Sequence, residues 1–318
     1  MLVSGSKLPW VNVHYRDRAE CGRSGYLPIL ASGSAPVKNV SGSVGVLKFV
    51  WNHPANEGAR ARALARAVGF QASGRLLGRR TLARLGRRSR VWADLHRTGA
   101  SKIVYANPPD HPEMLAWQRV LRPGDLFVDV GANIGGYAIW AADLGAEVIA
   151  LEPAGDTFGL LQENVALNGY PVRAIQAAAG AVCGTVRFTS GQDTVNRMDP
   201  GGSVETTMVT IDSVIGDRAV AGMKVDVEGF EIEVLRGCER ALSEHRIGLI
   251  QLEWNTASLA AVGTDRLPVA DQLARHGYSL YRPDPHGVLA PIPSMSFGAD
   301  VFARPEGEQA DQQFAPRG

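Results

Sequence analysis

Acidic residues follow apolar runs at points where buried strands are expected to end. Asp226 and Glu228 come directly after Met223-Lys-Val, and Glu253 ends the run that begins at Leu249. Because side chains two residues apart in extended backbone point to the same side, Asp226 and Glu228 are expected to face one cleft. A partly buried carboxylate has a raised pKa and can take a proton from a hydroxyl group. The pattern predicts an acidic cleft with a general base.

A glycine-rich turn follows another apolar run, in the segment from Leu126 to Tyr137 that reads LFVDVGANIGGY. Gly131 allows backbone to approach a ligand closely, and Gly135 or Gly136 permits a helix to pack tightly on the preceding strand. The N-terminus of that helix offers free N–H groups to an anionic group. The spacing G-x-N-x-G-G differs from the dinucleotide motif G-x-G-x-x-G.

A further carboxylate supports a nucleoside site. Glu152 ends the apolar run Glu147–Leu151, which is the next strand candidate after the one that contains Asp129. An acid at the end of the second strand, about 20 residues further on, commonly accepts hydrogen bonds from ribose hydroxyls. The two motifs together fit a nucleoside ligand that has a carboxylate and no pyrophosphate, and S-adenosylmethionine is such a ligand.

Alternating strands and helices must position these residues. We predict helices over 137–144, 157–167, 230–242 and 269–276, and strands over 126–130, 147–151, 172–176, 186–189, 223–227, 248–253, 279–281 and 299–302. Such alternation predicts an α/β fold with a mainly parallel sheet that is covered on both faces.

Five segments together resemble the FkbM family of S-adenosylmethionine-dependent methyltransferases. They are DVGANIGGY, ALEP, TIDSV, KVDVEGFEIEVLRG and IQLEWN, and the resemblance extends over roughly residues 113–305. It implies a class I methyltransferase fold, which is a Rossmann-like seven-stranded sheet with an antiparallel last strand. It also implies O-methyl transfer to a sugar, polyketide or related metabolite.

The resemblance also implies roles for individual residues. Four residues would frame the cofactor, Glu152 would hold its ribose, and the segment 177–180, which contains Ala178, would lie beside its adenine. Glu113 stands at an upstream acidic position that would face the same cleft. The four framing residues are Asp129, Gly131, Asn133 and Gly135.

For the transfer itself, we hypothesise that Asp226 lies beside the methyl group and positions the acceptor or acts as the base. Glu228 would support it or organise the turn, and Glu253 would complete the acidic cleft. No histidine pair in the sequence has metal-ligand spacing. Oxygen ligands for a divalent cation are offered by Asp226, Glu253 and Asn255. By analogy with other methyltransferases, a bound cation is therefore an open alternative.

The chain of 318 residues has a net charge of +1, yet its charges are unevenly distributed. Ten arginines and no acidic residue lie between Arg60 and Arg90, so the remainder has nine more acidic than basic residues. This segment, with Leu64, Val68, Leu76, Leu82 and Leu85 as apolar positions, is predicted to be helical and to be followed by strands over 90–95 and 102–106. It is either a solvated helical face or a patch for an anionic partner.

Composition and segment order predict four parts: a flexible leader over 1–45, an arginine-rich helical cap over 46–110, the methyltransferase domain over 111–304 and a disordered tail over 305–318. No apolar run is long enough for a membrane span. Three widely spaced cysteines favour a reducing, cytoplasmic location. A homodimer is left open.

Three functions of different classes fit these residues. The first is an O-methyltransferase that acts on a small-molecule hydroxyl. The second is a methyltransferase that grips a nucleic acid or another anionic macromolecule through Arg60–Arg90, and the near-zero net charge argues against the nucleic acid. The third is a non-catalytic cofactor-binding protein.

Overall fold

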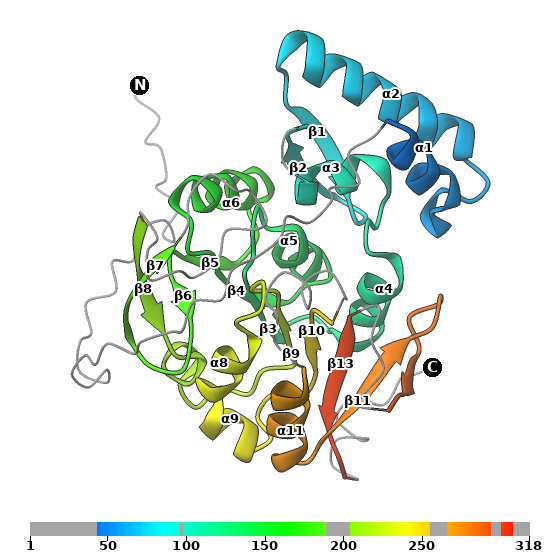
Figure 1. Cartoon of the computed structure of the whole chain (residues 1–318). Coiled ribbons are helices and arrows are strands. Elements are labelled where there is room, and N and C mark those ends of the chain that lie inside the picture. The colour runs from blue at the N-terminus through cyan, green and yellow to red at the C-terminus, as the bar shows by residue number, and fades with distance from the viewer. Residues whose placement is uncertain (1–42, 96–97, 189–203, 255–265, 294–299, 308–318) are drawn as a thin grey trace, which may run out of the picture.

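A single eight-stranded sheet forms the centre of the molecule (Figure 1). The computed structural model describes residues 43–95, 98–188, 204–254, 266–293 and 300–307. The sheet order is β12-β11-β13-β10-β9-β3-β4-β5. Its strands are β3 (Leu126–Val130), β4 (Glu147–Leu151), β5 (Val172–Ile175), β9 (Gly222–Val225), β10 (Ile250–Leu252), β11 (Tyr278–Pro283), β12 (Leu289–Pro291) and β13 (Val301–Pro305).

The strand directions confirm the predicted fold class. Strands β5, β4, β3, β9 and β10 pair in parallel, whereas β13 runs antiparallel to both of its neighbours, β10 and β11. Seven strands therefore have the class I order with an antiparallel last strand, and β12 adds an eighth strand at the edge through a hairpin with β11.

Helices cover both faces of this sheet because its central strands are apolar on both sides. In β3, Phe127 packs in one core cluster and Val128 in the other, and the whole strand is buried. One face is covered by α4 (His111–Val120), α5 (Gly136–Asp143) and α6 (Gly155–Asn168). The other is covered by α7 (Ile211–Ile215), α8 (Glu231–Arg236), α9 (Glu239–Ser243) and α11 (Leu267–Arg275).

The N-terminal segment forms a cap above α5 and α6 in Figure 1. It consists of α1 (Ser43–Asn52), the 3-10 helix η1 (Pro54–Asn56), α2 (Arg60–Leu77), β1 (Thr81–Leu85), β2 (Ser89–Ala93) and α3 (Thr98–Tyr105). Arg66 of α2 donates to the carbonyl oxygens of Val104 at 2.6 Å and Tyr105 at 3.0 Å. These carbonyls lie at the end of α3, where a helix leaves its last carbonyl groups without a partner of its own.

The β1–β2 hairpin is attached to the sheet domain through the exposed edge of β2. The Trp92 N–H donates to the Asn164 side chain at 2.8 Å, and the Arg90 N–H donates to Asn168 at 2.9 Å. In the hairpin turn, the Arg87 N–H donates to Asp143 at 2.8 Å. These side chains of α5 and α6 satisfy backbone groups that would otherwise lie open at a strand edge.

The cap corrects two predictions. Residues 102–106 belong mainly to helix α3, not to a strand, because Ala100, Ile103 and Val104 are buried at helical spacing. Leu82 and Leu85 lie on β1, since α2 ends before Gly78, which has a φ of 59°. A glycine with this left-handed backbone commonly terminates a helix. The cap thus combines helices with a hairpin and is not purely helical.

Two predictions in the sheet domain also change. The predicted helix over 230–242 is divided into α8 and α9 at Gly237, where an added Cβ would lie 2.1 Å from the Gly180 carbonyl oxygen. The strand predicted at 186–189 belongs to a separate three-stranded sheet that the sequence did not suggest. That sheet has the order β6-β8-β7 and contains β6 (Ala178–Ala179), β7 (Gly184–Phe188) and β8 (Val204–Val209).

Parts of the predicted organisation lie outside the described residues. These are positions 1–42 of the leader and 308–318 of the tail. Within the described ranges, no helix combines the length and apolar character needed to cross a bilayer.

Candidate active site

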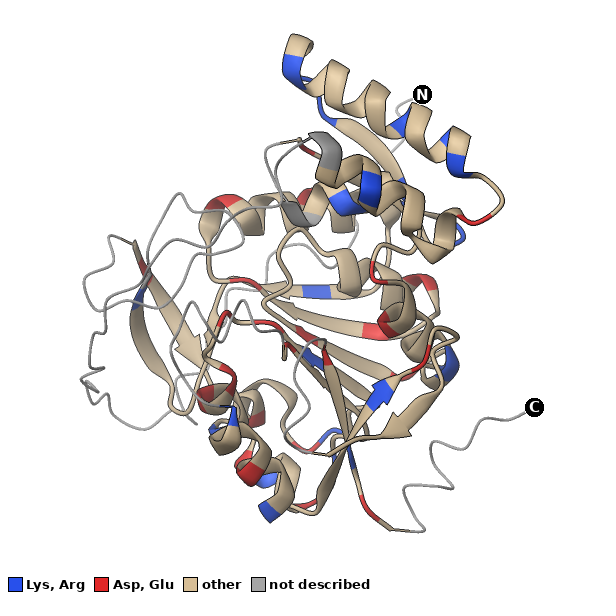
Figure 2. Ribbon diagram, turned by 45° about the vertical axis from the view of Figure 1, so that its right-hand side comes forward, with Lys and Arg blue, Asp and Glu red and all other residues tan. Residues whose placement is uncertain are grey.

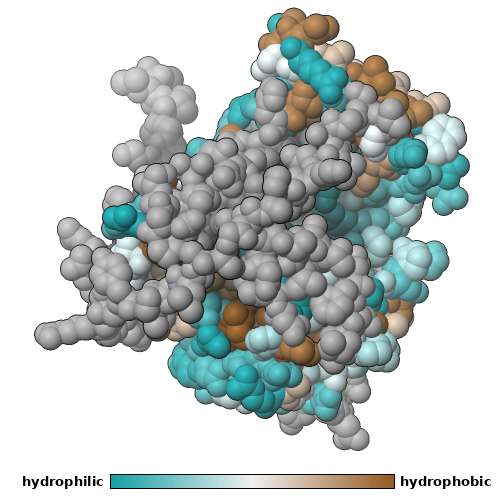
Figure 3. All heavy atoms as spheres, in the orientation of Figure 1, coloured by the Kyte–Doolittle hydropathy of each residue, from teal (hydrophilic) through white to brown (hydrophobic). Residues whose placement is uncertain are grey.

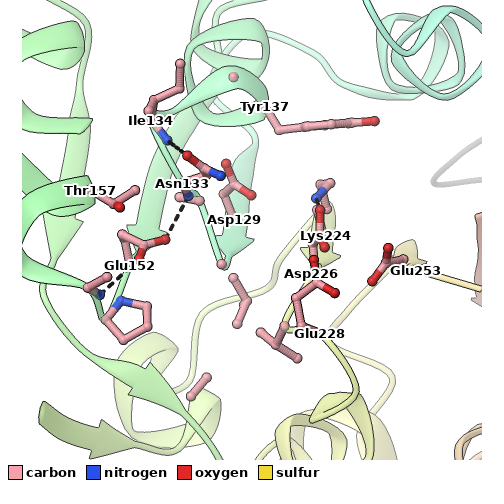
Figure 4. Close-up of a pocket in the computed structure, with 18 of the residues that line it drawn as sticks. Asp129, Asn133, Ile134, Tyr137, Glu152, Thr157, Lys224, Asp226, Glu228 and Glu253 are labelled. Carbon is pink, nitrogen blue, oxygen red and sulfur yellow. Dashed lines mark hydrogen bonds and ion pairs between the residues drawn. The ribbon is translucent and has the colours of Figure 1, made fainter. Parts of the chain in front are cut away.

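A cavity of about 280 Å³ opens at the carboxyl ends of four adjacent parallel strands, β4, β3, β9 and β10. Figure 4 shows its two sides. Asn133 and Glu152 lie on one side, and Asp226, Glu228 and Glu253 lie on the other. Ligands of open α/β sheets bind at this edge, and the volume is close to the lower limit of about 300 Å³ for ligand pockets.

The glycine turn brings the backbone of β3 against that of β9. Gly131 has a φ of 78°, and a Cβ at this position would lie 2.0 Å from the Asp226 carbonyl oxygen. Asn133 also has a left-handed backbone, with a φ of 50°, and its side chain accepts from the Ile134 N–H at 2.8 Å. The turn therefore lies directly beside the acidic side of the cavity.

Asp129 fixes the start of α5 and faces the same cavity. It is buried, and one carboxylate oxygen accepts from the Ala138 N–H at 2.8 Å. The other oxygen, Oδ1, has no hydrogen-bond partner among the described residues. Burial raises the pKa of Asp129 to about 6, although Lys224 opposes this shift. Asp129 thus keeps a free acceptor for a ligand.

Glu152 connects the end of β4 to the glycine turn. Its carboxylate oxygens accept from the Asn133 N–H at 2.9 Å and the Ala154 N–H at 3.0 Å. Burial raises the pKa of Glu152 to about 7, and these two hydrogen bonds counteract part of that shift. The side chain is held in one position, with lone pairs left for a ligand's hydroxyl groups.

The three predicted acids converge on the opposite side. Asp226, Glu228 and Glu253 each offer a carboxylate oxygen within 4.8 Å of the others. Burial, and then the charges of Asp226 and Glu231, raises the pKa of Glu228 to about 7. Burial, and then Asp226 and Glu228, raises the pKa of Glu253 to about 9. Since the groups interact strongly, their protons leave in separate steps.

A buried lysine balances part of this negative charge. Lys224 Nζ lies 2.6 Å from Asp226 Oδ2, its side chain is 6% exposed, and it sits 4.6 Å from the centre of the Tyr137 ring. Burial alone would lower the pKa of Lys224, but Asp226 and Asp129 raise it further than burial lowers it. Lys224 is therefore a fixed cation that orients Asp226.

Eight of the ten predicted site residues line the cavity: Asp129, Gly131, Asn133, Glu152, Ala178, Asp226, Glu228 and Glu253. Gly135 and Glu113 are not among the lining residues. Gly135 starts α5 with a φ of 94° and packs against Leu161. Glu113 lies on α4, and burial raises its pKa to about 7 with help from Asp300 and Asp110. Asn255 lies outside the described residues.

Several lining residues were not predicted from the sequence. Lys224 lies two residues before Asp226, and the alternation of a strand could have placed both on one side. Lys102, Ile103, Pro109 and Asp110 also line the cavity, and they come from α3 and the segment after it. No local pattern indicates that a cap residue reaches the site. The segment Asn107-Pro-Pro-Asp110 thus contributes to the wall through Pro109 and Asp110.

Comparisons with known proteins identify a methyltransferase domain in the part of the chain that forms most of this cavity. Residues 129–280 match the Methyltransferase FkbM domain. The chain is 31% identical over 161 residues to the 31-O-demethyl-FK506 methyltransferase FkbM of Streptomyces tacrolimicus, and the match covers 38% of this chain and 62% of that protein. It is 32% identical over 136 residues to the hexuronic acid methyltransferase AglP of Haloferax volcanii, and that match covers 40% and 56% respectively.

The chain spans less than two thirds of the length of each of these relatives. A solved TehB-like S-adenosylmethionine-dependent methyltransferase of Corynebacterium glutamicum has a TM-score of 0.38 at 13% identity, and the match covers 62% of this chain and 88% of that one. The fold itself is defined by the strand order above. Residues 129–280 therefore resemble a domain of the FkbM methyltransferase family.

Proposed function

We propose that this chain, whose residues 129–280 match an FkbM methyltransferase domain, transfers a methyl group from S-adenosylmethionine to a hydroxyl group of a small, uncharged metabolite. The observation that carries this proposal is one cavity in which a glycine turn and Glu152 face three clustered carboxylates. The glycine turn and Glu152 suit a nucleoside ligand, and the three carboxylates suit proton removal from an alcohol.

The residues on the turn side fit S-adenosylmethionine, which supplies a methyl group on a positively charged sulfur. Glu152 would accept from the ribose hydroxyls, and Gly131 lets the backbone come close because it has no Cβ. The free, buried oxygen of Asp129 offers an acceptor for an ammonium group. Ala178 on β6 would contribute a small apolar surface beside the adenine.

Among the three acids, Glu228 has the properties of a general base. Its pKa of about 7 matches the working range of such a group near neutral pH. Its backbone has a φ of 51°, and a left-handed conformation of this kind is typical of functional positions. We therefore assign proton removal from the acceptor hydroxyl to Glu228, and we assign positioning of the acceptor to Asp226, which Lys224 holds.

Glu253 would play a complementary part. With a pKa of about 9, its carboxyl group is protonated at neutral pH and can donate a hydrogen bond to an acceptor oxygen. Two carboxyl groups with separated pKa values thus provide an acceptor and a donor for one hydroxyl-bearing ligand. Of the two roles expected for Asp226, this division keeps positioning of the acceptor and gives proton removal to Glu228.

The charge of the cavity favours an uncharged acceptor. Six acidic residues line it against two lysines, Lys102 and Lys224; the acids are Asp110, Asp129, Glu152, Asp226, Glu228 and Glu253. An acceptor with its own carboxylate would meet like charges at short range, which costs free energy. Of the two relatives, one is named for a hexuronic acid and the other for a 31-O-demethyl substrate. We assign this chain a neutral alcohol.

We expect turnover with neutral alcohols and little with uronic acids. The experiment supplies S-adenosylmethionine with a macrolide alcohol, a neutral hexoside or the matching hexuronoside, and measures S-adenosylhomocysteine formation. We expect kcat/KM for the hexuronoside to be at least about tenfold below that for the hexoside. Faster turnover of the hexuronoside would contradict the acceptor class. Cofactor binding in calorimetry without turnover on any alcohol would favour a non-catalytic protein.

We also expect methyl transfer to survive removal of divalent cations. The three acids have the spacing of a cation site. However, the ammonium group of Lys224 already occupies one Asp226 oxygen and would repel a second cation at that place. Turnover is measured after exhaustive treatment with EDTA and again after addition of Mg²⁺. If EDTA abolishes turnover and Mg²⁺ restores it, the three acids would be assigned to metal binding.

A further inference from the structure

Helix α2 is apolar on its solvent side as well as on its buried side. Ala63, Ala67, Phe70 and Gly74 pack inside the cap. On the opposite side, exposed apolar residues recur every three or four positions, which places them on one helix face. We call this the outer face of α2; it consists of Ala61, Ala65, Val68, Ala72 and Leu76.

Exposed large apolar side chains are concentrated in the cap, and two of them, Val68 and Leu76, lie on this face. Of the eleven that are exposed in the described part of the chain, six lie between Leu47 and Leu82. Leu76 is 81% exposed, Leu77 62% and Val68 57%. Figure 3 shows apolar residues gathered along α2 at the outer edge of the molecule. Exposed apolar side chains that gather on one helix face commonly mark an interaction site.

Arginines surround the outer face. Arg60 and Arg62 begin α2, Arg75 lies in its last turn, and Arg79 follows its C-terminus; all four are exposed, and Figure 2 shows basic positions along the helix. Within the described residues, Arg62, Arg75 and Arg79 form no ion pair. No acidic residue occurs from Arg60 to Arg90 to neutralise them. The helix thus presents exposed leucine and valine within a positive field.

The combination of exposed apolar side chains with arginines favours one class of binding partner over others. A nucleic acid would pair its phosphates with the arginines but would leave Val68 and Leu76 in water or against a polar backbone. A second copy of this chain would bring two arginine-rich segments together, and their charges would repel. An anionic lipid surface accommodates both features, because headgroups pair with arginines while apolar side chains enter the acyl boundary.

We propose that the outer face of α2 binds the surface of a membrane that contains anionic lipids. The helix has 18 residues, and it would lie in the plane of the surface with its outer face toward the lipid. The proposal is independent of the methyl-transfer reaction, since α2 contributes no residue to the wall of the cavity.

The test is co-sedimentation of the full chain with lipid vesicles. Vesicles of phosphatidylcholine alone are compared with vesicles that also contain phosphatidylglycerol, at low and high salt. We expect binding only to the second kind, and weaker binding at high salt. The double variant Val68→Asp/Leu76→Asp should lose at least about tenfold in vesicle affinity, and Arg75→Glu/Arg79→Glu should lose binding as well.

The matched control is Leu167→Asp on α6, where the leucine is 40% exposed outside the cap. It should bind vesicles like the unchanged chain, and all variants should keep the same thermal unfolding. Three results would overturn the proposal. They are no binding to phosphatidylglycerol vesicles, tight RNA or DNA binding that Val68→Asp/Leu76→Asp leaves intact, and a dimer in size-exclusion chromatography that this variant dissociates while vesicle binding is absent.

Discussion

Replacing Glu228 by Gln should lower kcat/KM by about 10²- to 10⁴-fold, the range for loss of a general base. Gln has the same shape and leaves the backbone of this residue unchanged, but it cannot accept a proton from the alcohol. Cofactor affinity, measured by calorimetry, should remain the same because Glu228 lies on the acid side of the cavity (Figure 4). The effect should therefore appear in turnover and not in binding.

The assignment of Glu228 as the base and Glu253 as a hydrogen-bond donor predicts that kcat/KM has a bell-shaped dependence on pH. A base works only when deprotonated, so kcat/KM should rise with pH through about 7, where Glu228 loses its proton. A donor works only when protonated, so kcat/KM should fall through about 9, where Glu253 ionises. Glu228→Gln should abolish the rising limb.

Glu253→Gln is the matched control for this pair. Its amide still donates a hydrogen bond and does not titrate, so turnover near neutral pH should change little and the falling limb should disappear. If Glu228→Gln keeps the rising limb and full turnover while Asp226→Asn loses both, Asp226 is the base and our assignment of the two residues is wrong.

The sheet and the position of its acids could be predicted because local patterns determine them. Strands β3 and β4 have the predicted bounds, since each is a short apolar run that ends in a turn or an acid. Once two such strands are parallel, their carboxyl ends share an edge, which explains why Asp129, Glu152 and Asp226 were expected together.

The parts of the fold and site that could not be predicted depend on contacts between segments that are distant in the sequence. The run Lys102-Ile-Val-Tyr-Ala reads as a strand by composition, but packing inside the cap makes it a helix. Lys102 and Asp110 reach the cavity because the cap packs on α5 and α6 through α3 and through the β1–β2 hairpin. The pKa values of Glu228 and Glu253 follow from burial and from neighbours on other strands, and no linear motif encodes these.

Replacing Gly131 by Ala should weaken cofactor binding by at least about 100-fold although it adds only one methyl group. The new Cβ would lie 2.0 Å from the Asp226 carbonyl oxygen. The backbone fixes the position of a Cβ, and the oxygen is itself a backbone atom, so no rotamer change can relieve this contact. To reach even 3.0 Å, the ends of β3 and β9 must separate by about 1 Å. A displacement of this size can cost about 100-fold in a site that depends on alignment.

The left-handed backbone of Gly131 adds a smaller cost in stability when the residue is replaced by Ala. A control variant separates this strain from the effect of the close contact. Gly58 has the same φ of 78°, yet an added Cβ there meets nothing within 4 Å. Gly58→Ala should therefore cost only the strain of about 1–2 kcal/mol. Gly131→Ala should cost more than about 3 kcal/mol in denaturant unfolding, and its folded fraction should bind S-adenosylmethionine at least about 100-fold more weakly in calorimetry. Equal losses in the two variants would mean that strain alone explains Gly131. The close approach of β3 and β9 would then have no part in forming the cofactor site.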